Sequence, residues 1–156
     1  MKVYLVQHAE AKPKDMDPAR PLSEIGRGHA EQVAAVAAQL GLEIDEIRHS
    51  GKTRAEQTAT ILGAALSPTQ GVRAASGLGP VDDVAPVGDE LTSLSKPIML
   101  VGHLPFMERL AGYLVTGDAD QAVVDFVNAA IVCLEEEKGQ WQVAWILTPD
   151  IAAVKG

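Results

Sequence analysis

Two apolar segments of the chain have the pattern of strands that are buried on both faces. Lys2 to Val6 and Pro97 to Val101 are mostly apolar and show no alternation of polar and apolar positions. Strands of a parallel sheet that is covered by helices on both sides have such continuous apolar runs. A shorter strand is expected from Glu46 to His49. The pattern therefore predicts a sheet with helices on both of its faces.

Two segments between these strands repeat their apolar residues at helical spacing. Ser23 is a good N-cap for a helix that runs to about Leu40 and is closed by Gly41. Thr53 is expected to cap a second helix, which has one apolar face and runs to about Leu66. Each of these helices would connect two strands of the sheet.

The rest of the middle of the chain alternates between loops and shorter helices. Segments 9–22 and 67–86 are rich in loop-forming residues, and the second has room for one short extended piece. A modest helix is expected near Asp89–Leu94. Another is expected from Leu104 to about Val115, because Pro105 suits the first turn of a helix.

The last part of the chain predicts two neighbouring strands, at 127–134 and 141–148, joined by a turn around Gly139. Period-two alternation in the second strand assigns one set of residues to a common face: Trp141, Val143, Trp145 and Leu147. The order of all elements implies a three-layer α/β/α sandwich whose mainly parallel sheet has an antiparallel edge. We expect residues 1–156 to form a single domain.

Composition narrows the function classes. The chain has 156 residues and a net charge of −8, which argues against nonspecific binding to nucleic acid or to an anionic membrane. Its single cysteine, Cys133, lies in an apolar run and is expected in the core, so the chain fits a reducing compartment. The apolar segments are too short for a signal peptide or a membrane span, so a cytoplasmic protein is expected.

Three polar residues follow the predicted strands or open the helices after them. His8 ends the first strand, Arg54 lies near the start of the second helix, and His103 follows the strand at 97–101. The carboxyl ends of parallel strands meet at one crevice, so these side chains are expected to converge. A neutral imidazole can attack phosphorus, a guanidinium can hold two phosphoryl oxygens, and a second imidazole can donate to the others. This chemistry requires neither a metal nor a cofactor.

These motifs together resemble the histidine phosphatase superfamily, also called phosphoglycerate mutase-like, over nearly the whole chain. The resemblance is closest to the small bacterial phosphohistidine phosphatases, which have no cap domain. It rests on four pieces of sequence: His8 after the first strand, Arg20-Pro21-Leu22-Ser23 with Gly26, Ser50 with Arg54-Ala55-Glu56-Gln57-Thr58, and Gly102-His103-Leu104-Pro105. It implies a nucleophile at His8, phosphate binding by Arg54 and His103, and action on phosphohistidine in a protein. Arg20 and Ser50 are further candidates for phosphate binding.

The chain departs from the family pattern beside the nucleophile. The family motif is Arg-His-Gly, whereas this chain has Gln7-His8-Ala9. Gln7 can donate a hydrogen bond to phosphate but brings no charge. A hydrogen bond to a charged group is worth roughly 1.5–3 kcal/mol against about 1 for a neutral one, so a loss of ~10-fold or more in rate is expected. Arg20, Lys52 and Lys12 are candidates to compensate for the missing charge. The Cβ of Ala9 would be strained if the backbone there had a positive φ.

A second departure concerns the general acid. The region that supplies a Glu or Asp in larger family members here contains Asp82 and Asp83, which we expect to be a solvated loop pair rather than catalytic acids. An imidazole leaving group needs less help from an acid than an alkoxide does. This difference favours phosphohistidine over sugar phosphates as the substrate.

The other polar residues near the motifs are given simpler roles. His29 is expected to be solvated on a polar helix face, and His49 to be structural or supporting. Ser50 is expected to support its loop rather than to react. Asn128 is a candidate for a hydrogen bond to a loop of the site.

Three functions remain open. The first is a metal-independent phosphatase that acts on a phosphohistidine-bearing protein and releases phosphate. The second is a phosphoprotein-binding module with weak turnover, since Gln7 replaces the clamping arginine. The third is a phosphatase or mutase for small phosphorylated molecules, although a mutase needs a product-retaining cap and a dedicated acid.

Overall fold

A computed structural model describes residues 1–154 of the chain. Within this range the six strands form one sheet in the order β3-β2-β4-β1-β5-β6. The strands are β1 (Lys2–Gln7), β2 (Glu46–His49), β3 (Val72–Ala74), β4 (Ile98–Gly102), β5 (Ile131–Glu137) and β6 (Gln140–Leu147). The helices are α1 (Glu24–Gln39), α2 (Thr53–Leu66), α3 (Ala85–Ser93), α4 (Phe106–Thr116) and α5 (Pro149–Ala152).

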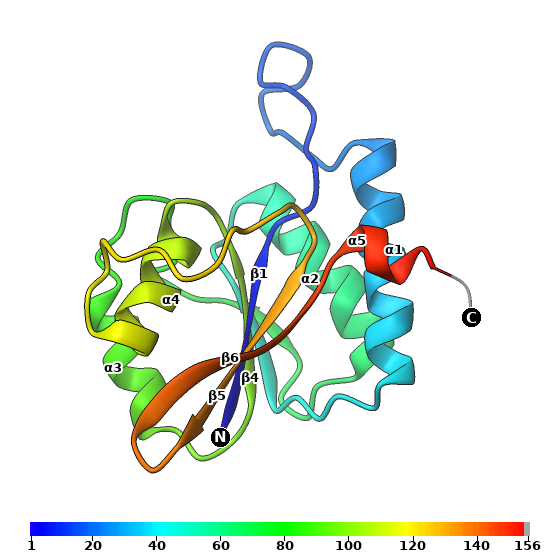
Figure 1. Cartoon of the computed structure of the whole chain (residues 1–156). Coiled ribbons are helices and arrows are strands. Elements are labelled where there is room, and N and C mark those ends of the chain that lie inside the picture. Colours follow the sequence, from blue (N-terminus) through cyan, green and yellow to red (C-terminus); the bar gives the residue numbers. More distant parts are fainter. Residues whose placement is uncertain (155–156) are drawn as a thin grey trace.

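The sheet is mainly parallel and has an antiparallel edge, as the sequence predicts. β3, β2, β4 and β1 pair in parallel, whereas β5 runs antiparallel to β1 and β6 antiparallel to β5. Helices α1, α2 and α5 cover one face of the sheet, and α3 and α4 cover the other (Figure 1). The expected three-layer α/β sandwich is therefore confirmed.

The continuous apolar run of β1 follows directly from these two helical layers. Val3 and Leu5 point into the core that is shared with α3 and α4, whereas Tyr4 and Val6 point into the core that is shared with α1 and α2. All four side chains are at most 2% exposed. A strand with a solvated face would need polar residues at alternate positions.

The start of α1 is as expected, and the starts of three other helices differ from the sequence prediction. The Ser23 hydroxyl accepts a hydrogen bond from the N–H of Gly26 and caps α1. The cap of α2 is Lys52 rather than Thr53, because Lys52 is still extended and its carbonyl accepts the N–H groups of the first turn. α3 begins four residues early, with a proline in its first turn, and α4 begins at Phe106 rather than at Leu104.

The predicted strand at 127–134 is wrong at both ends. Residues 128–129 form a turn in which Ala129 has a positive φ of 68°, so β5 begins only at Ile131 and continues to Glu137. The N–H of Ala130 donates to the carbonyl of Val127 and closes this turn before the chain enters β5. This placement brings the turn next to the end of β1, where the backbone N–H of Ala129 donates to the carbonyl of Gln7.

The expectation that the odd-numbered residues of β6 share one face is also wrong. Trp141 and Val143 pack on the α3–α4 side of the sheet, whereas Trp145 and Leu147 pack on the α1–α2 side. Cys133 pairs with Trp145 and the next residue of β5 pairs with Val143, so β6 contains one extra residue at this point. Such a β-bulge shifts the alternation by one position.

Other expectations are confirmed, and one element was not predicted. Cys133 is fully buried, as its apolar surroundings indicate. The short α5 follows the predicted strand at 141–148 and was not itself predicted; its N-cap is Thr148, whose hydroxyl accepts the N–H of Ile151. Within residues 1–154, no helix combines the length and the apolar character that a membrane crossing requires.

Candidate active site

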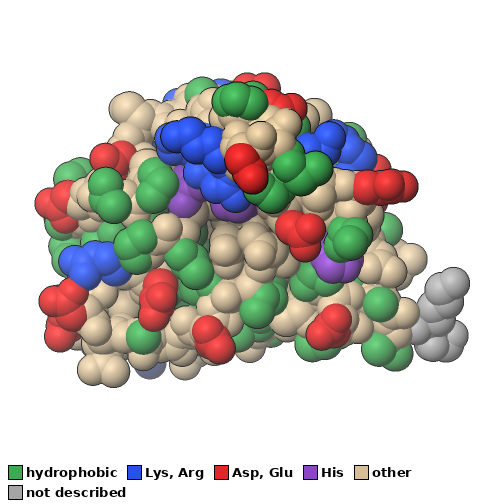
Figure 2. All heavy atoms as spheres, turned by 90° about the horizontal axis from the view of Figure 1, so that it is seen from above, with side chains coloured by type: hydrophobic (Ala, Val, Ile, Leu, Met, Phe, Trp, Pro, Cys, Tyr) green, Lys and Arg blue, Asp and Glu red, His purple; other side chains and the backbone are tan. Residues whose placement is uncertain are grey.

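The candidate residues gather at the edge of the sheet where β1, β2 and β4 end. Gln7 pairs with Gly102 and His49 with Val101, so the three strands end at nearly the same level. The residues that follow them, His8, Ser50 and His103, are thereby placed together. The backbone N–H of His8 donates to the carbonyl of Gly102, which continues the pairing of β1 and β4. Figure 2 shows Lys and Arg side chains beside His side chains near the middle of this face.

The ring of His8 is held in one orientation. Its Nδ1 lies 2.7 Å from the carbonyl oxygen of Ala9. Because a carbonyl only accepts, Nδ1 carries the proton and Nε2 is left with a free lone pair. Burial lowers the pKa of His8, and the positive charges of Arg54 and Arg20 lower it further, against the opposing effect of the Ala9 hydrogen bond. The lowered pKa favours the neutral, nucleophilic form.

The backbone around His8 is fixed by two side chains from other elements. Asn128 donates from Nδ2 to the carbonyl of His8 over 2.8 Å, so the hydrogen bond for which it was a candidate is present. The buried hydroxyl of Thr58 accepts the N–H of Ala9 at 3.0 Å and donates to the carbonyl of Arg54 at 2.8 Å. Thr58 thus connects the segment that carries the predicted nucleophile to the helix that carries the predicted phosphate-binding arginine.

His103 lies next to His8, with the two ring centroids 5.1 Å apart. Its Nε2 is 2.6 Å from the hydroxyl of Ser50, and its buried Nδ1 has no hydrogen-bond partner within residues 1–154. Burial, with a smaller effect from the neighbouring His8, lowers the pKa of His103 to about 3. His103 is therefore neutral in the free protein, and an approaching dianion would favour its protonated form.

Positive charge reaches the pair of histidines from three directions. Arg54 lies in the first turn of α2, and its buried Nε has no hydrogen-bond partner among the described residues. Burial and the charge of Arg20 lower the pKa of Arg54. Arg20 and Lys52 both contribute to the lowered pKa of His103. Arg20 itself has a positive φ of 50° and donates from Nε to the carbonyl of Lys12. Arg20 and Lys52 are thus close enough to act on the site electrostatically.

The two positions that depart from the family motif differ in their structural consequences. Ala9 is fully buried and is not among the residues with a positive φ, so its Cβ causes no backbone strain. The Oε1 atom of Gln7 is buried and has no hydrogen-bond partner within the described part of the chain. The replacement of glycine is therefore accommodated, whereas Gln7 leaves an unpaired polar atom beside the nucleophile.

The acidic pair and the remaining histidines lie outside the group of site residues. Asp82 and Asp83 are exposed and accept hydrogen bonds from backbone N–H groups of their own loop, which fits the expected loop roles. His49 is buried and accepts the N–H of Gly51, so it supports the turn that leads to Ser50. His29 is half-buried and lines a cavity, which differs from the solvated position expected for it.

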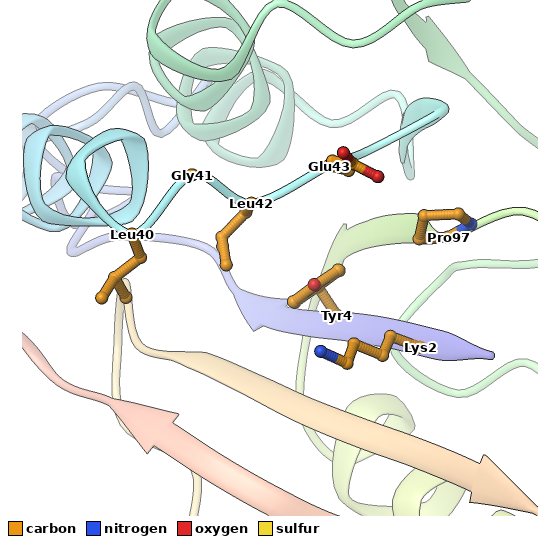
Figure 3. A pocket seen from close by; sticks show the side chains of 7 residues that line it. All are labelled: Lys2, Tyr4, Leu40, Gly41, Leu42, Glu43 and Pro97. Carbon is orange, nitrogen blue, oxygen red and sulfur yellow. The ribbon is translucent and has the colours of Figure 1, made fainter.

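A separate cavity of about 380 Å³ lies at the other end of β1 (Figure 3). Lys2, Tyr4 and Leu42 are among the residues that line it. Burial raises the pKa of Tyr4 to about 12, so its hydroxyl stays protonated at neutral pH. Because Lys2 and His8 lie at opposite ends of the same strand, this cavity is not part of the candidate site.

Sequence reasoning missed three residues that shape the site. Besides Thr58, Gln57 accepts the N–H of Leu22 with its side-chain oxygen and so ties the loop after His8 to α2. Gly26 lies against that loop: a Cβ at this position would overlap the carbonyl oxygen of Glu10. All three lie within the motifs quoted for the family resemblance, but the motifs alone do not show what each residue contacts.

No family model matches the chain. Its sequence and its fold are nevertheless similar to those of one class of proteins. It is homologous to a phosphohistidine phosphatase, and its structural neighbours are proteins of the histidine phosphatase (phosphoglycerate mutase-like) superfamily. This homology supports a phosphatase, that is, a hydrolase.

The similar proteins are as follows. Phosphohistidine phosphatase SixA from Escherichia coli (strain K12) is 26% identical over 155 residues, which cover 96% of this chain and 94% of that protein. A solved structure of the protein histidine phosphatase SixA complexed with tungstate has a TM-score of 0.85, with 26% identity over 96% of this chain and 98% of that one. A mycobacterial glucosyl-3-phosphoglycerate phosphatase has a TM-score of 0.74 and 18% identity, covering 92% of this chain and 97% of that one; this likeness shows a shared fold alone.

Proposed function

We propose that the chain is a metal-independent phosphohistidine phosphatase in which His8 accepts the phosphoryl group. The observation that carries the proposal is the hydrogen bond from Nδ1 of His8 to the Ala9 carbonyl, because it leaves Nε2 unprotonated beside His103 and Arg54. The homology to SixA supports phosphohistidine as the substrate. The partner is then a protein that carries a phosphorylated histidine on its surface.

In the first step, the lone pair of His8 Nε2 attacks the phosphorus atom of the substrate. A new P–N bond forms to His8, the P–N bond to the substrate imidazole breaks, and that imidazole leaves with its electron pair and takes up a proton from solvent. The neutral form of His8 is required for attack, and the lowered pKa of His8 supplies it at neutral pH. A solvent proton suffices because an imidazole is a better leaving group than an alkoxide.

The neighbouring residues stabilise the charge on the transferring group. Arg54 holds two phosphoryl oxygens, and its unpaired buried Nε is one donor for this purpose. His103 donates to a third oxygen, and the hydroxyl of Ser50 orients its ring over 2.6 Å. Arg20 and Lys52 add positive charge, in agreement with their effect on the pKa of His103. In this scheme Arg20 replaces in part the charge that Gln7 does not provide.

In the second step, water attacks the phosphorus of phosphorylated His8. The bond between Nε2 and phosphorus breaks, orthophosphate leaves, and the ring of His8 returns to its neutral form. Asp82 and Asp83 take no part in this scheme, since both carboxylates are engaged by backbone N–H groups of their own loop.

A second candidate function is a phosphoprotein-binding module with little turnover. The unpaired Oε1 of Gln7 favours it, because this position lacks the cation that the family pattern supplies beside the nucleophile. Arg54, His103 and Ser50 would still bind a phosphorylated histidine. Phosphate release from a saturating amount of substrate separates the two functions: a binding module forms a stable complex, whereas a phosphatase turns over many times.

Phosphoramidate and free phosphohistidine are the substrates for the first test, with a chelator present throughout. We expect release of orthophosphate at a rate that the chelator leaves unchanged. Tungstate is expected to inhibit by competing for the phosphate position. Activity that disappears with the chelator and returns with a divalent ion would overturn the metal-independent mechanism, and tight binding without release would favour the binding module.

A further inference from the structure

A second concavity adjoins the candidate active site. It has a volume of about 290 Å³, and Glu10, Val127, Asn128 and Asp150 are among the residues that line it. It is joined to the site at two points. Asn128 donates to the carbonyl of His8, and Glu10 is only two residues from His8, after the Ala9 carbonyl that accepts the His8 ring proton. The lining of the concavity and the segment that carries His8 are thus connected by a hydrogen bond and by two residues of backbone.

The lining combines an apolar wall with two carboxylates. Val127, 45% exposed, and the ring of Pro149 form an apolar wall. Glu10 and Asp150 are exposed and place two carboxylates at the same concavity. Within residues 1–154 the carboxylate of Asp150 makes no hydrogen bond or salt bridge, and the carboxylate of Glu10 accepts only from the hydroxyl of Ser23. Both carboxylates therefore have oxygens free for a cationic partner.

A lysine or arginine side chain has the matching composition. Its aliphatic stem packs on apolar surface while its charged end stays near solvent and near carboxylates. The acidic concavity also lies directly beside a site whose own charges are positive: Arg20, Lys52 and Arg54. A substrate that presents an anionic phosphoryl group next to a cationic side chain would be complementary to both parts, and the reverse arrangement would be repelled by both.

We propose that this concavity, which we call the Asp150 subsite, binds a lysine or arginine side chain next to the phosphohistidine of the substrate protein. The proposal rests on the proposed phosphatase function and deepens it by naming a feature of the substrate. It assigns to the loop before β5 and to the segment at α5 the task of selecting among phosphorylated proteins. The His8 site binds the phosphoryl group, and the Asp150 subsite binds the side chain next to the phosphohistidine.

Phosphohistidine pentapeptides test the proposal. In a series on an alanine background, each position flanking the phosphohistidine carries in turn lysine, norleucine or glutamate, and kcat/KM is measured for each peptide. Norleucine controls for the apolar stem. We expect the lysine peptide to exceed the norleucine peptide by about two- to fivefold at one or more positions, which is the range of an exposed ion pair. The preference should shrink as ionic strength rises.

Enzyme variants then assign the preference to the subsite. Asp150→Asn should bring the kcat/KM of the lysine peptide close to that of the norleucine peptide. Asp150→Lys should reverse the preference, so that the glutamate peptide has the higher kcat/KM. Asp125→Asn is the matched control, since Asp125 is an exposed aspartate in the same loop as Val127 but does not line the concavity. The Asp125→Asn variant should keep the same ratio of lysine-peptide to norleucine-peptide kcat/KM as the unchanged protein.

The outcomes are distinct. Hydrolysis of phosphoramidate and of all peptides without a lysine preference would overturn the Asp150 subsite and leave the phosphatase function intact. The same holds for a preference that Asp150→Asn and Asp150→Lys leave unchanged. No hydrolysis of phosphoramidate or of any peptide would overturn the phosphatase function and the subsite with it.

Discussion

The hydroxyl of Thr58 accepts the backbone N–H of Ala9 over 3.0 Å, across 49 positions of sequence. The same hydroxyl donates to the carbonyl of Arg54, one turn earlier in α2. One buried side chain thus sets the distance between the end of β1 and the start of α2. The relative positions of a nucleophile at His8 and a guanidinium at Arg54 depend on this contact.

Thr58→Val should therefore impair the site more than the fold. It leaves the N–H of Ala9 buried without a partner, which costs about 1–3 kcal/mol in the free energy of unfolding. We expect a loss of about tenfold or more in kcat for phosphoramidate, because misplacement of the reacting groups acts mainly on the transition state. Thr58→Ser keeps the hydroxyl and should retain most of the activity. Equal kcat in Thr58→Val and Thr58→Ser would contradict the positioning role.

Gly26 and Gly28 form a matched pair within α1. A Cβ on Gly26 would overlap the carbonyl oxygen of Glu10, whereas a Cβ on Gly28 would meet nothing within 4 Å. Gly26→Ala should lower the free energy of unfolding by about 1–3 kcal/mol or more, since backbone must move. Gly28→Ala should raise it by up to about 1 kcal/mol through helix propensity. Urea unfolding measures both, and a neutral Gly26→Ala would show that the loop after His8 yields at no cost.

The acid sensitivity of the fold should depend on His103. Its pKa is about 3 in the folded protein, against an ordinary value near 6.5 in the unfolded chain. The folded state therefore binds fewer protons between these values, and stability that is present above pH 6.5 is lost as the pH falls towards 3. Each pH unit in this window lowers the free energy of unfolding by roughly 1.4 kcal/mol at most.

Urea unfolding at a series of pH values measures this contribution. His103→Asn should lose less stability between pH 6.5 and pH 4 than the unchanged protein, whereas His29→Asn, a half-buried histidine on α1 away from the site, serves as the control. Parallel pH profiles for the unchanged protein and His103→Asn would mean that His103 takes up its proton in the folded state at its ordinary pKa.

Substitution of Gln7 by arginine tests whether the missing positive charge limits the rate of the reaction. Gln7→Arg places a guanidinium where the family pattern has one, so we expect faster turnover of phosphoramidate, by about tenfold, and tighter binding of tungstate. Arg20→Ala should slow the unchanged protein more than it slows Gln7→Arg, because Arg20 would then be partly redundant. Slower turnover in Gln7→Arg with no effect of Arg20→Ala in either background would contradict both impairment by Gln7 and compensation by Arg20.

The sequence predicts the layers of the fold and the convergence of the site because both follow from local patterns. The unbroken apolar run of Lys2 to Val6 requires cover on both faces, and parallel strands necessarily bring His8 and His103 to one edge. The bulge in β6 is different. Ala144 is compatible with either face of a strand, so period-two alternation continues past it in the sequence although the side chains of Trp141 and Trp145 lie on opposite faces.

The supporting residues of the site could not be predicted for a related reason. Thr58 and Gln57 each bond to a backbone group that lies 35 or more positions away. A hydrogen bond of this kind depends on how helices and loops meet in space, and a threonine in a helix looks the same in sequence whether its hydroxyl bonds within the helix or beyond it. The orientation of the His8 ring likewise becomes visible only with the carbonyl of Ala9 in place.

The most direct measurement of the central claim is the residue that carries phosphate during turnover. Incubation with radiolabelled phosphoramidate, followed by rapid alkaline quenching and peptide mapping, should recover an acid-labile phosphoryl group on His8. His8→Ala should show neither the label nor turnover, while His29→Ala and His49→Ala should retain both. A label on any other residue, or full turnover by His8→Ala, would contradict the account.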